Sequence, residues 1–208
     1  MHKLERPPAE PAALKEARDS GCPDWDHLPS DKKAEVQVEL ILMQNGRCAY
    51  CEATVDQGEG HIEHFRRKNQ EWFPEKTFEW TNLYYSCMRN GSCGCHKDRV
   101  LQKEEVDCLI DPCVDNPEDF LQFTHNGGVE ARSDLSMQDA LRAKVTINTF
   151  NLKQEDLIAE RANVLRGYEW LEQYPATQID EVLAEVAATE GTPFVTAIYH
   201  YFGRRLVG

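Results

Sequence analysis

The chain has 208 residues and a formal net charge of −13, with 41% hydrophobic and 9% aromatic residues. This composition excludes a chain that is disordered throughout, and the length allows one large domain or a compact core with an appendage. The acidic balance argues against a broad basic face for nucleic acid, because phosphate contacts provide most non-specific affinity.

The N-terminal segment carries charges and prolines where an export signal would be apolar, and no stretch approaches the roughly 20 apolar residues of a membrane helix. We therefore expect a cytoplasmic protein. Residues 1–30 are rich in proline and charge, which indicates an arm lying on the surface. A helix is expected after Ser30, a plausible N-cap, and should end at Asn45-Gly46. Residues 47–52 and 61–65 flank a glycine-rich connection and predict two strands of a β-hairpin.

An aromatic-rich loop is expected over residues 69–81, and a short helix over 95–102. Turn signals predict an irregular linker over 109–124 and a hairpin turn at Asn126-Gly127-Gly128. Apolar residues then recur at helical spacing in four successive segments between residues 136 and 201. We predict an α+β fold with three parts: an N-terminal arm and helix over 1–46, a core over 47–103, and a linker with a helical region over 104–208.

Five of the eight cysteines fall within one short part of the chain, which favours metal ligands over disulfides in a reducing compartment. Cys48-x-x-Cys51 has the spacing at which two thiolates share one metal ion. Cys87 and Cys93 are the favoured partners, with Cys95 as the alternative to Cys93. Four thiolates would form a closed structural zinc site, because no coordination position remains for water.

His61-Ile62-Glu63-His64 would place His61 and Glu63 on one face of a strand and His64 on the other. Each residue alone is weak evidence, because a single histidine or glutamate is usually structural or solvated. The order Glu63-His64, Asn82-Leu83 and His96-Lys97 within a frame of paired cysteines is far more specific.

These motifs resemble those of the HNH endonucleases, and in particular the PtuB type found in Septu anti-phage systems and beside some retrons. The resemblance rests on Cys48–Glu52, Ile62–Arg66, Trp80–Leu83 and the segment from Ser86 to Lys97. It extends to Ile110–Asp119 and Arg142–Ile147, and covers most of residues 35–165. Two departures stand out: Arg67 occupies a position where many relatives have proline, and the spacing from Cys87 to Lys97 is longer than in the commonest form.

The resemblance implies a ββα-metal core that hydrolyses nucleic-acid phosphodiester bonds, with DNA as the expected substrate. His64 would be the general base, Asn82 would brace its loop, and Glu63 with His96 would hold Mg²⁺ or Mn²⁺. Phosphates would be contacted by a set of nearby cations, namely Arg66, Lys68 and Lys97.

Much of the acidity lies in the predicted C-terminal helices, which favours a protein partner there, and the resemblance suggests an ATPase of the PtuA type. The alternative is a catalytically inactive, zinc-stabilised module that binds nucleic acid or protein. The presence of Glu63, His64, Asn82 and His96 together favours the nuclease, because a binding module needs none of them.

Overall fold

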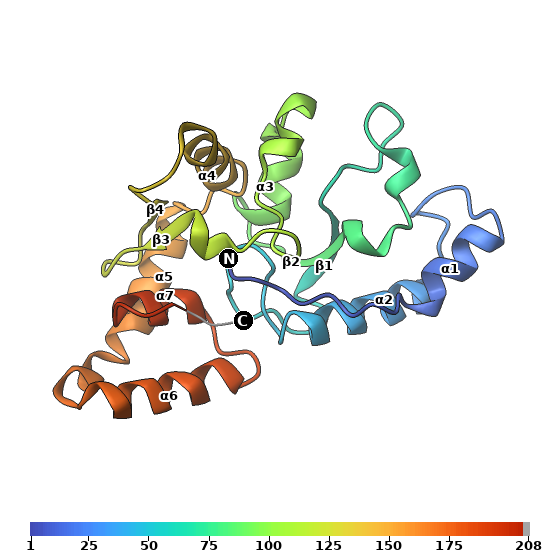
Figure 1. The fold of residues 1–208 in the computed structure, drawn as a ribbon. Coiled ribbons are helices and arrows are strands. Elements are labelled where there is room, and N and C mark those ends of the chain that lie inside the picture. The colour runs from blue at the N-terminus through green and yellow to red at the C-terminus, as the bar shows by residue number, and fades with distance from the viewer. Residues whose placement is uncertain (206–208) are drawn as a thin grey trace.

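The computed structural model describes residues 1–205, which form a mixed helix-and-strand fold (Figure 1). The α-helices of this part of the chain are α1 (Ala12–Asp19), α2 (Ser30–Met43), α3 (Cys93–Val100), α4 (Met137–Thr149), α5 (Glu155–Arg166), α6 (Ala176–Ala188) and α7 (Val195–Tyr201). The strands are β1 (Gly60–His64), β2 (Leu83–Cys87), β3 (Leu121–Phe123) and β4 (Val129–Ala131). Short 3₁₀ turns lie at Pro74–Lys76, Trp80–Asn82, Lys103–Cys108, Pro117–Asp119 and Glu169–Gln173.

The central sheet consists of β1 and β2, which pair antiparallel with Glu63 opposite Tyr84 and His64 opposite Leu83. The predicted hairpin between residues 47–52 and 61–65 is therefore wrong. Residues 48–52 instead form a tight turn, in which the Glu52 N–H donates to the Cys48 carbonyl at 3.1 Å. This turn packs beside β2, where the Ala49 N–H donates to the Tyr85 carbonyl at 3.1 Å.

Helix α3 follows β2 and contacts both this strand and α4. It begins at Cys93, two residues before the predicted start. The Gly94 N–H donates to the Ser86 hydroxyl at 3.1 Å, which fixes the first turn of the helix to β2. Figure 1 shows α3 beside the central sheet, with α1 and α2 on one side of the molecule and α4 to α7 on the other.

The N-terminal segment is anchored to the rest of the molecule by buried apolar side chains, although many of residues 1–30 are exposed at the surface. Met1, Leu4 and Leu14 are buried, and α1 packs against α2. The Arg6 guanidinium lies over the Trp80 and Tyr84 rings and donates to the Trp80 carbonyl at 2.8 Å. A few apolar residues spaced along a proline-rich segment were enough to anchor it. Ser30 is the first residue of α2 rather than its N-cap, which is Pro29.

The helical C-terminal region and its preceding hairpin follow the predicted order. The turn between β3 and β4 lies at residues 124–128, where the Thr124 N–H donates to the Gly128 carbonyl at 3.0 Å and Gly127 has φ of 81°. Arg161 on α5 is buried and donates to the Gly127 and Leu152 carbonyls, which joins the hairpin to the helices.

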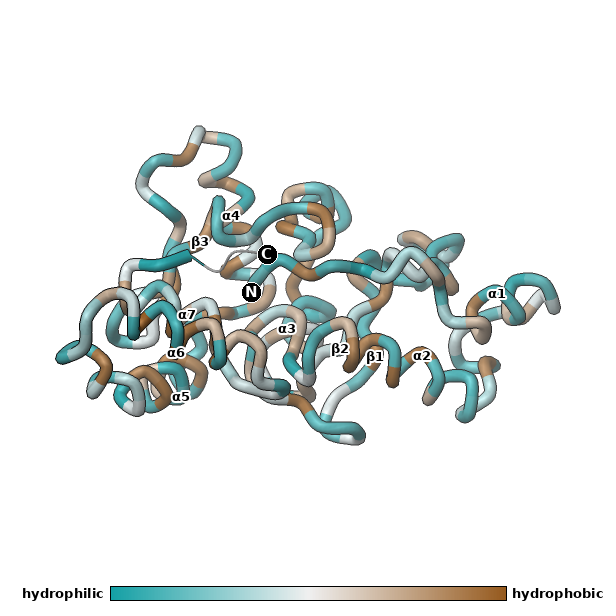
Figure 2. The backbone as a smooth tube through the Cα atoms, turned by 60° about the horizontal axis from the view of Figure 1, so that its bottom comes forward, coloured by the Kyte–Doolittle hydropathy of each residue, from teal (hydrophilic) through white to brown (hydrophobic). Residues whose placement is uncertain are grey.

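One buried hydrophobic cluster contains residues of all three predicted parts, for example Leu40, Leu83 and Leu183. Figure 2 shows hydrophobic segments spread along the chain rather than gathered in one long run. Among residues 1–205, no helix is long and apolar enough to cross a membrane.

Candidate functional site

Four buried cysteines form a compact group. The sulfur atoms of Cys48, Cys51, Cys87 and Cys93 all lie within 4.8 Å of one another. The first two belong to the turn after α2, Cys87 ends β2, and Cys93 begins α3 with φ of 53°. These are the four cysteines that the sequence favoured, and Cys95 lies outside the group.

The close approach of the thiols in this group shifts pKa values in opposite directions. Burial opposes ionisation of Cys48, but hydrogen bonds from the other three cysteines bring its pKa well below the usual thiol value. The hydrogen bond with Cys48 is the largest cause that raises the pKa of Cys51 and of Cys93 well above that value. The backbone contributes as well, because the Cys87 N–H donates to the Cys48 sulfur at 3.4 Å. Four thiolates of this kind can hold a metal such as zinc in tetrahedral geometry.

A second feature is a hollow of about 410 Å³ beside β1, which we call the β1 cavity. Its lining comes from β1, the loop after it and α3: His61, Ile62, Glu63, His64, Arg67, Lys68, Asn69 and Asp98. Alternation along a strand would separate Glu63 from His64. They share a cavity because β1 ends at His64 and the chain then turns into the loop.

His64 is held as a neutral imidazole. Its Nε2 lies 3.0 Å from the Thr77 carbonyl oxygen, and its ring packs edge-on against Trp25 with centroids 4.9 Å apart. Burial lowers the pKa of His64 to about 4, so the neutral form dominates at neutral pH. Because a carbonyl only accepts, Nε2 carries the proton, and the Nδ1 lone pair is left to act as a base.

Glu63 and His61 lie on the same face of β1, as predicted from their spacing. Glu63 Oε2 is 3.3 Å from His61 Nε2, and this hydrogen bond raises the pKa of His61. Glu63 Oε1 is 2.8 Å from the buried ammonium of Lys97. The Glu63 carboxylate is thus fixed between the cavity and α3.

Asn82 clamps the loop that follows His64. Its Oδ1 accepts from the Arg66 N–H at 2.7 Å, and its Nδ2 donates to the Arg66 carbonyl at 2.9 Å and the Lys76 carbonyl at 3.1 Å. The Phe65 N–H also donates to the Asn82 carbonyl at 2.9 Å. These contacts are the ones that a residue bracing the His64 loop would make.

The structure does not bring His96 to this cavity. His96 Nδ1 lies 2.9 Å from the Thr149 carbonyl oxygen, and the ring lines a separate hollow between α3 and α4 together with Val100 and Leu141. The reason is the start of the helix: with Cys93 in the cysteine group, the residue of α3 that faces Glu63 is Gly94. The expected pair of Glu63 and His96 is not formed.

The three predicted phosphate contacts also separate. Lys68 lines the β1 cavity, whereas Arg66 pairs with Asp107 at 2.8 Å and lines a different hollow. Lys97 cannot reach a phosphate as placed, because its ammonium is buried between Glu63 and Asp98.

Sequence reasoning missed Arg67, which lines the cavity, stacks on Trp72 at 4.8 Å and pairs with Asp98 at 3.3 Å. The Arg-Arg-Lys run at 66–68, which begins two residues after the candidate base, was the signal that could have identified it.

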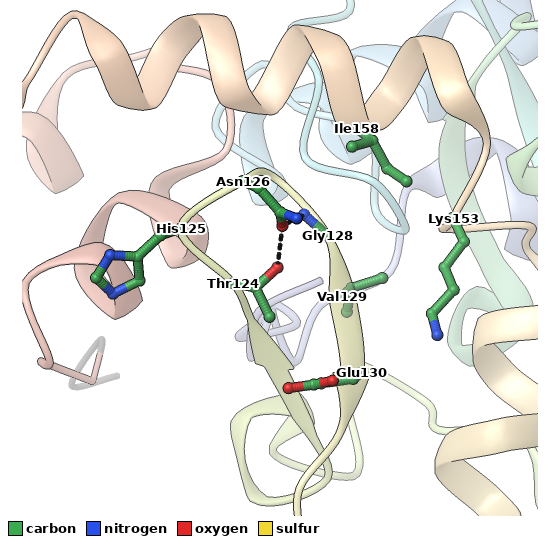
Figure 3. Close-up of a pocket in the computed structure, with 8 residues that line it drawn as sticks. All are labelled: Thr124, His125, Asn126, Gly128, Val129, Glu130, Lys153 and Ile158. Carbon is green, nitrogen blue, oxygen red and sulfur yellow. Dashed lines mark hydrogen bonds between the residues drawn. The ribbon is translucent and has the colours of Figure 1, made fainter.

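A larger hollow of about 620 Å³ lies at the tip of the β3–β4 hairpin (Figure 3). Its ionisable residues do not converge: His125 points away from Lys153, and they lie on opposite sides of the hairpin in this view. The hydrogen bond drawn there, from the Thr124 hydroxyl to Asn126, is internal to the turn. This hollow therefore lacks the grouped chemistry of the β1 cavity.

Together these features define a mixed helix-and-strand protein with a buried four-cysteine group that can bind a metal such as zinc. No family model matches the chain. It is similar to the Septu protein PtuB of Bacillus thuringiensis, with 30% identity over 127 residues, 60% of this chain and 43% of that protein. It is also similar to the Septu protein PtuB of Bacillus mycoides, with 29% identity over 163 residues, 66% of this chain and 53% of that protein.

The predicted resemblance to PtuB is thereby confirmed. The chain spans about half the length of the curated relatives that it matches.

Proposed function

We propose that the chain is a metal-dependent endonuclease of the HNH type that hydrolyses phosphodiester bonds. The observation that carries this proposal is the β1 cavity, where a neutral histidine and a fixed carboxylate share one space with Arg67 and Lys68. The order of two antiparallel strands and a helix supports it, since the ββα-metal core has the same order. The similarity of the chain to the Septu PtuB proteins agrees with it as well.

In this proposal His64 Nδ1 takes the proton of the attacking water, and the Thr77 carbonyl holds the ring in the required tautomer. Arg67 and Lys68 contact the phosphates on either side of the bond that is cut. Asn82 keeps the loop in place, so that His64 and these two cations stay on one side of the substrate.

A bound Mg²⁺ or Mn²⁺ would stabilise the negative charge on the phosphate and the leaving oxygen. Glu63 fits such an ion, because Mg²⁺ and Mn²⁺ prefer carboxylate oxygens as ligands. Its Oε2 also lies 3.3 Å from a second potential ligand atom, His61 Nε2. The four-cysteine group has a structural rather than a catalytic role in this proposal. With four thiolates it leaves no position for substrate, so we assign it a structural zinc that joins the turn after α2, the end of β2 and the start of α3.

We propose DNA as the substrate and defence against phage as the setting, on the basis of the Septu proteins that the chain resembles. Purified zinc-loaded protein with Mg²⁺ or Mn²⁺ is expected to nick or cut DNA, and EDTA is expected to stop the reaction. Single- and double-stranded DNA, tRNA and other RNA should be assayed in parallel. Absence of metal-dependent cleavage on every substrate, with and without a partner, would favour the inactive binding module.

We further propose that the acidic C-terminal region binds a partner protein, an ATPase of the PtuA type. All six acidic residues that support this are exposed: Glu169, Glu172, Asp180, Glu181, Glu185 and Glu190. Such a surface repels DNA and suits a basic protein face. The two proteins, co-expressed, are expected to elute together in gel filtration at micromolar concentration. Separate elution at that concentration would contradict the proposed complex.

A further inference from the structure

The first turn of α3 is packed unusually tightly against β1 at Gly94. A Cβ atom added to Gly94 would lie 2.6 Å from Glu63 Oε2 and 3.0 Å from His61 Nε2, closer than side chains pack. The backbone of Gly94 does not require glycine, because its φ is not in the left-handed region. The reason for glycine here is therefore space: the volume that a side chain would occupy is taken by an imidazole nitrogen and a carboxylate oxygen.

These two atoms form a donor pair suited to a divalent cation. His61 Nε2 and Glu63 Oε2 are 3.3 Å apart and come from positions two residues apart on the same strand face. The His61 side chain is about one-third exposed at 32%, so the pair can be reached from the β1 cavity. Imidazole and carboxylate are both ligands that Mn²⁺ and related ions accept.

The surroundings fix the carboxylate of Glu63, whose side chain is 3% exposed, at the wall of the β1 cavity. Lys97 Nζ is 2.8 Å from the other oxygen, Oε1, and also donates to the His64 carbonyl at 3.1 Å. The buried ammonium therefore holds Glu63 from the side of α3, and Oε2 is turned toward His61. Asp98 contacts Lys97 at 2.7 Å and Arg67 at 3.3 Å, so its charge is already engaged at the cavity edge.

We propose that His61 and Glu63 together bind the divalent cation over Gly94, so that both protein ligands come from β1 and His96 takes no part. This inference rests on the proposed function for the role of the ion, and concerns which side chains hold it. The second ligand is His61 on β1, because the residue of α3 that faces Glu63 is Gly94, which has no side chain to offer. His96 is directed instead to the Thr149 carbonyl.

The test is Mn²⁺ affinity of the full zinc-loaded chain, followed by the loss of the EPR signal of free aqueous Mn²⁺. His61→Ala and Glu63→Gln are each expected to weaken binding about tenfold or more, whereas His96→Ala is expected to bind as the parent does. Gly94→Ala should also weaken binding, because its methyl group displaces the pair. Zinc content and thermal melting show that each variant is folded.

The inference is overturned if the parent binds no Mn²⁺, if His61→Ala binds as tightly as the parent, or if His96→Ala is the variant that loses affinity. These outcomes are separate from the nuclease proposal. If Mn²⁺ binding depends on His61 but the protein cleaves no nucleic acid, the cation site is supported and the proposed nuclease activity is contradicted. If His61→Ala still cleaves nucleic acid and binds Mn²⁺ with unchanged affinity, the nuclease proposal is supported and the cation site at His61 is contradicted.

Discussion

Cys93→Ser is expected to abolish zinc binding and to lower the melting temperature by about 10 °C or more. A structural zinc site contributes roughly 10 kcal/mol or more of apparent binding free energy, comparable to the whole stability of a small domain. For a chain of this size, each 1 kcal/mol lost lowers the melting temperature by about 2–4 °C. A hydroxyl is a poor ligand for this ion, so loss of one of four thiolates removes a large part of that contribution.

The matched control is Cys95→Ser, which makes the same chemical change two residues along the same helix. Cys95 is half-buried and outside the cysteine group, so this variant is expected to retain zinc and melt close to the parent. Zinc content by atomic emission and melting by circular dichroism measure both effects. If the two variants lost zinc equally, or neither did, the assignment of Cys93 as a ligand would fail.

The expected loss extends beyond the metal loops, because the C-terminal half is attached to them. The Cys93 N–H donates to the Phe150 carbonyl at 2.8 Å, and Tyr50, within the Cys48–Cys51 turn, stacks on Phe150 with ring centroids 3.9 Å apart. The Asn151 side chain donates to the Gly91 carbonyl at 2.7 Å. Loosening the cysteine group would therefore also loosen the junction of α4 and α5.

His64→Ala is the second large effect, and is expected to slow cleavage by about 10²-fold or more while zinc stays bound. General-base catalysis contributes roughly 10²–10⁴ in rate, and His64 is the residue whose neutral form and free Nδ1 suit that role. His64→Gln serves as a second variant, because its amide nitrogen lies about as far from the backbone as the imidazole Nε2 and can still donate to the Thr77 carbonyl and preserve the loop. Both variants are measured under single-turnover conditions.

His96→Ala is the control for this experiment, since it also removes an imidazole but from the hollow between α3 and α4. It is expected to cleave within a few-fold of the parent. A His96→Ala variant as slow as His64→Ala would show that the ring leaves the Thr149 carbonyl and enters the site.

Much of this arrangement could be predicted from local sequence. The Cys-x-x-Cys spacing limits how two thiols can be placed, and the two-residue spacing of His61 and Glu63 determines that they share a strand face. The C-terminal helices could be predicted from their apolar period, because that period directly reflects which residues are buried.

Other parts depend on contacts between distant segments, which local patterns do not contain. The partner of β1 is β2, about twenty residues away, rather than the nearer segment 47–52. His96 had no local signal for its direction, since that depends on which cysteine begins α3 and on the Thr149 carbonyl of α4. The sequence predicts Lys97 as a phosphate-contacting cation, and only the assembled fold shows its ammonium buried against Glu63.

Chemical rescue tests most directly whether His64 acts as the general base for phosphodiester cleavage in the β1 cavity. Imidazole added to His64→Ala can enter the space left by the side chain and replace the missing base. We predict that the single-turnover cleavage rate of this variant rises with imidazole concentration, while the parent and His96→Ala do not respond. A parent-like rate in His64→Ala without imidazole would contradict the account.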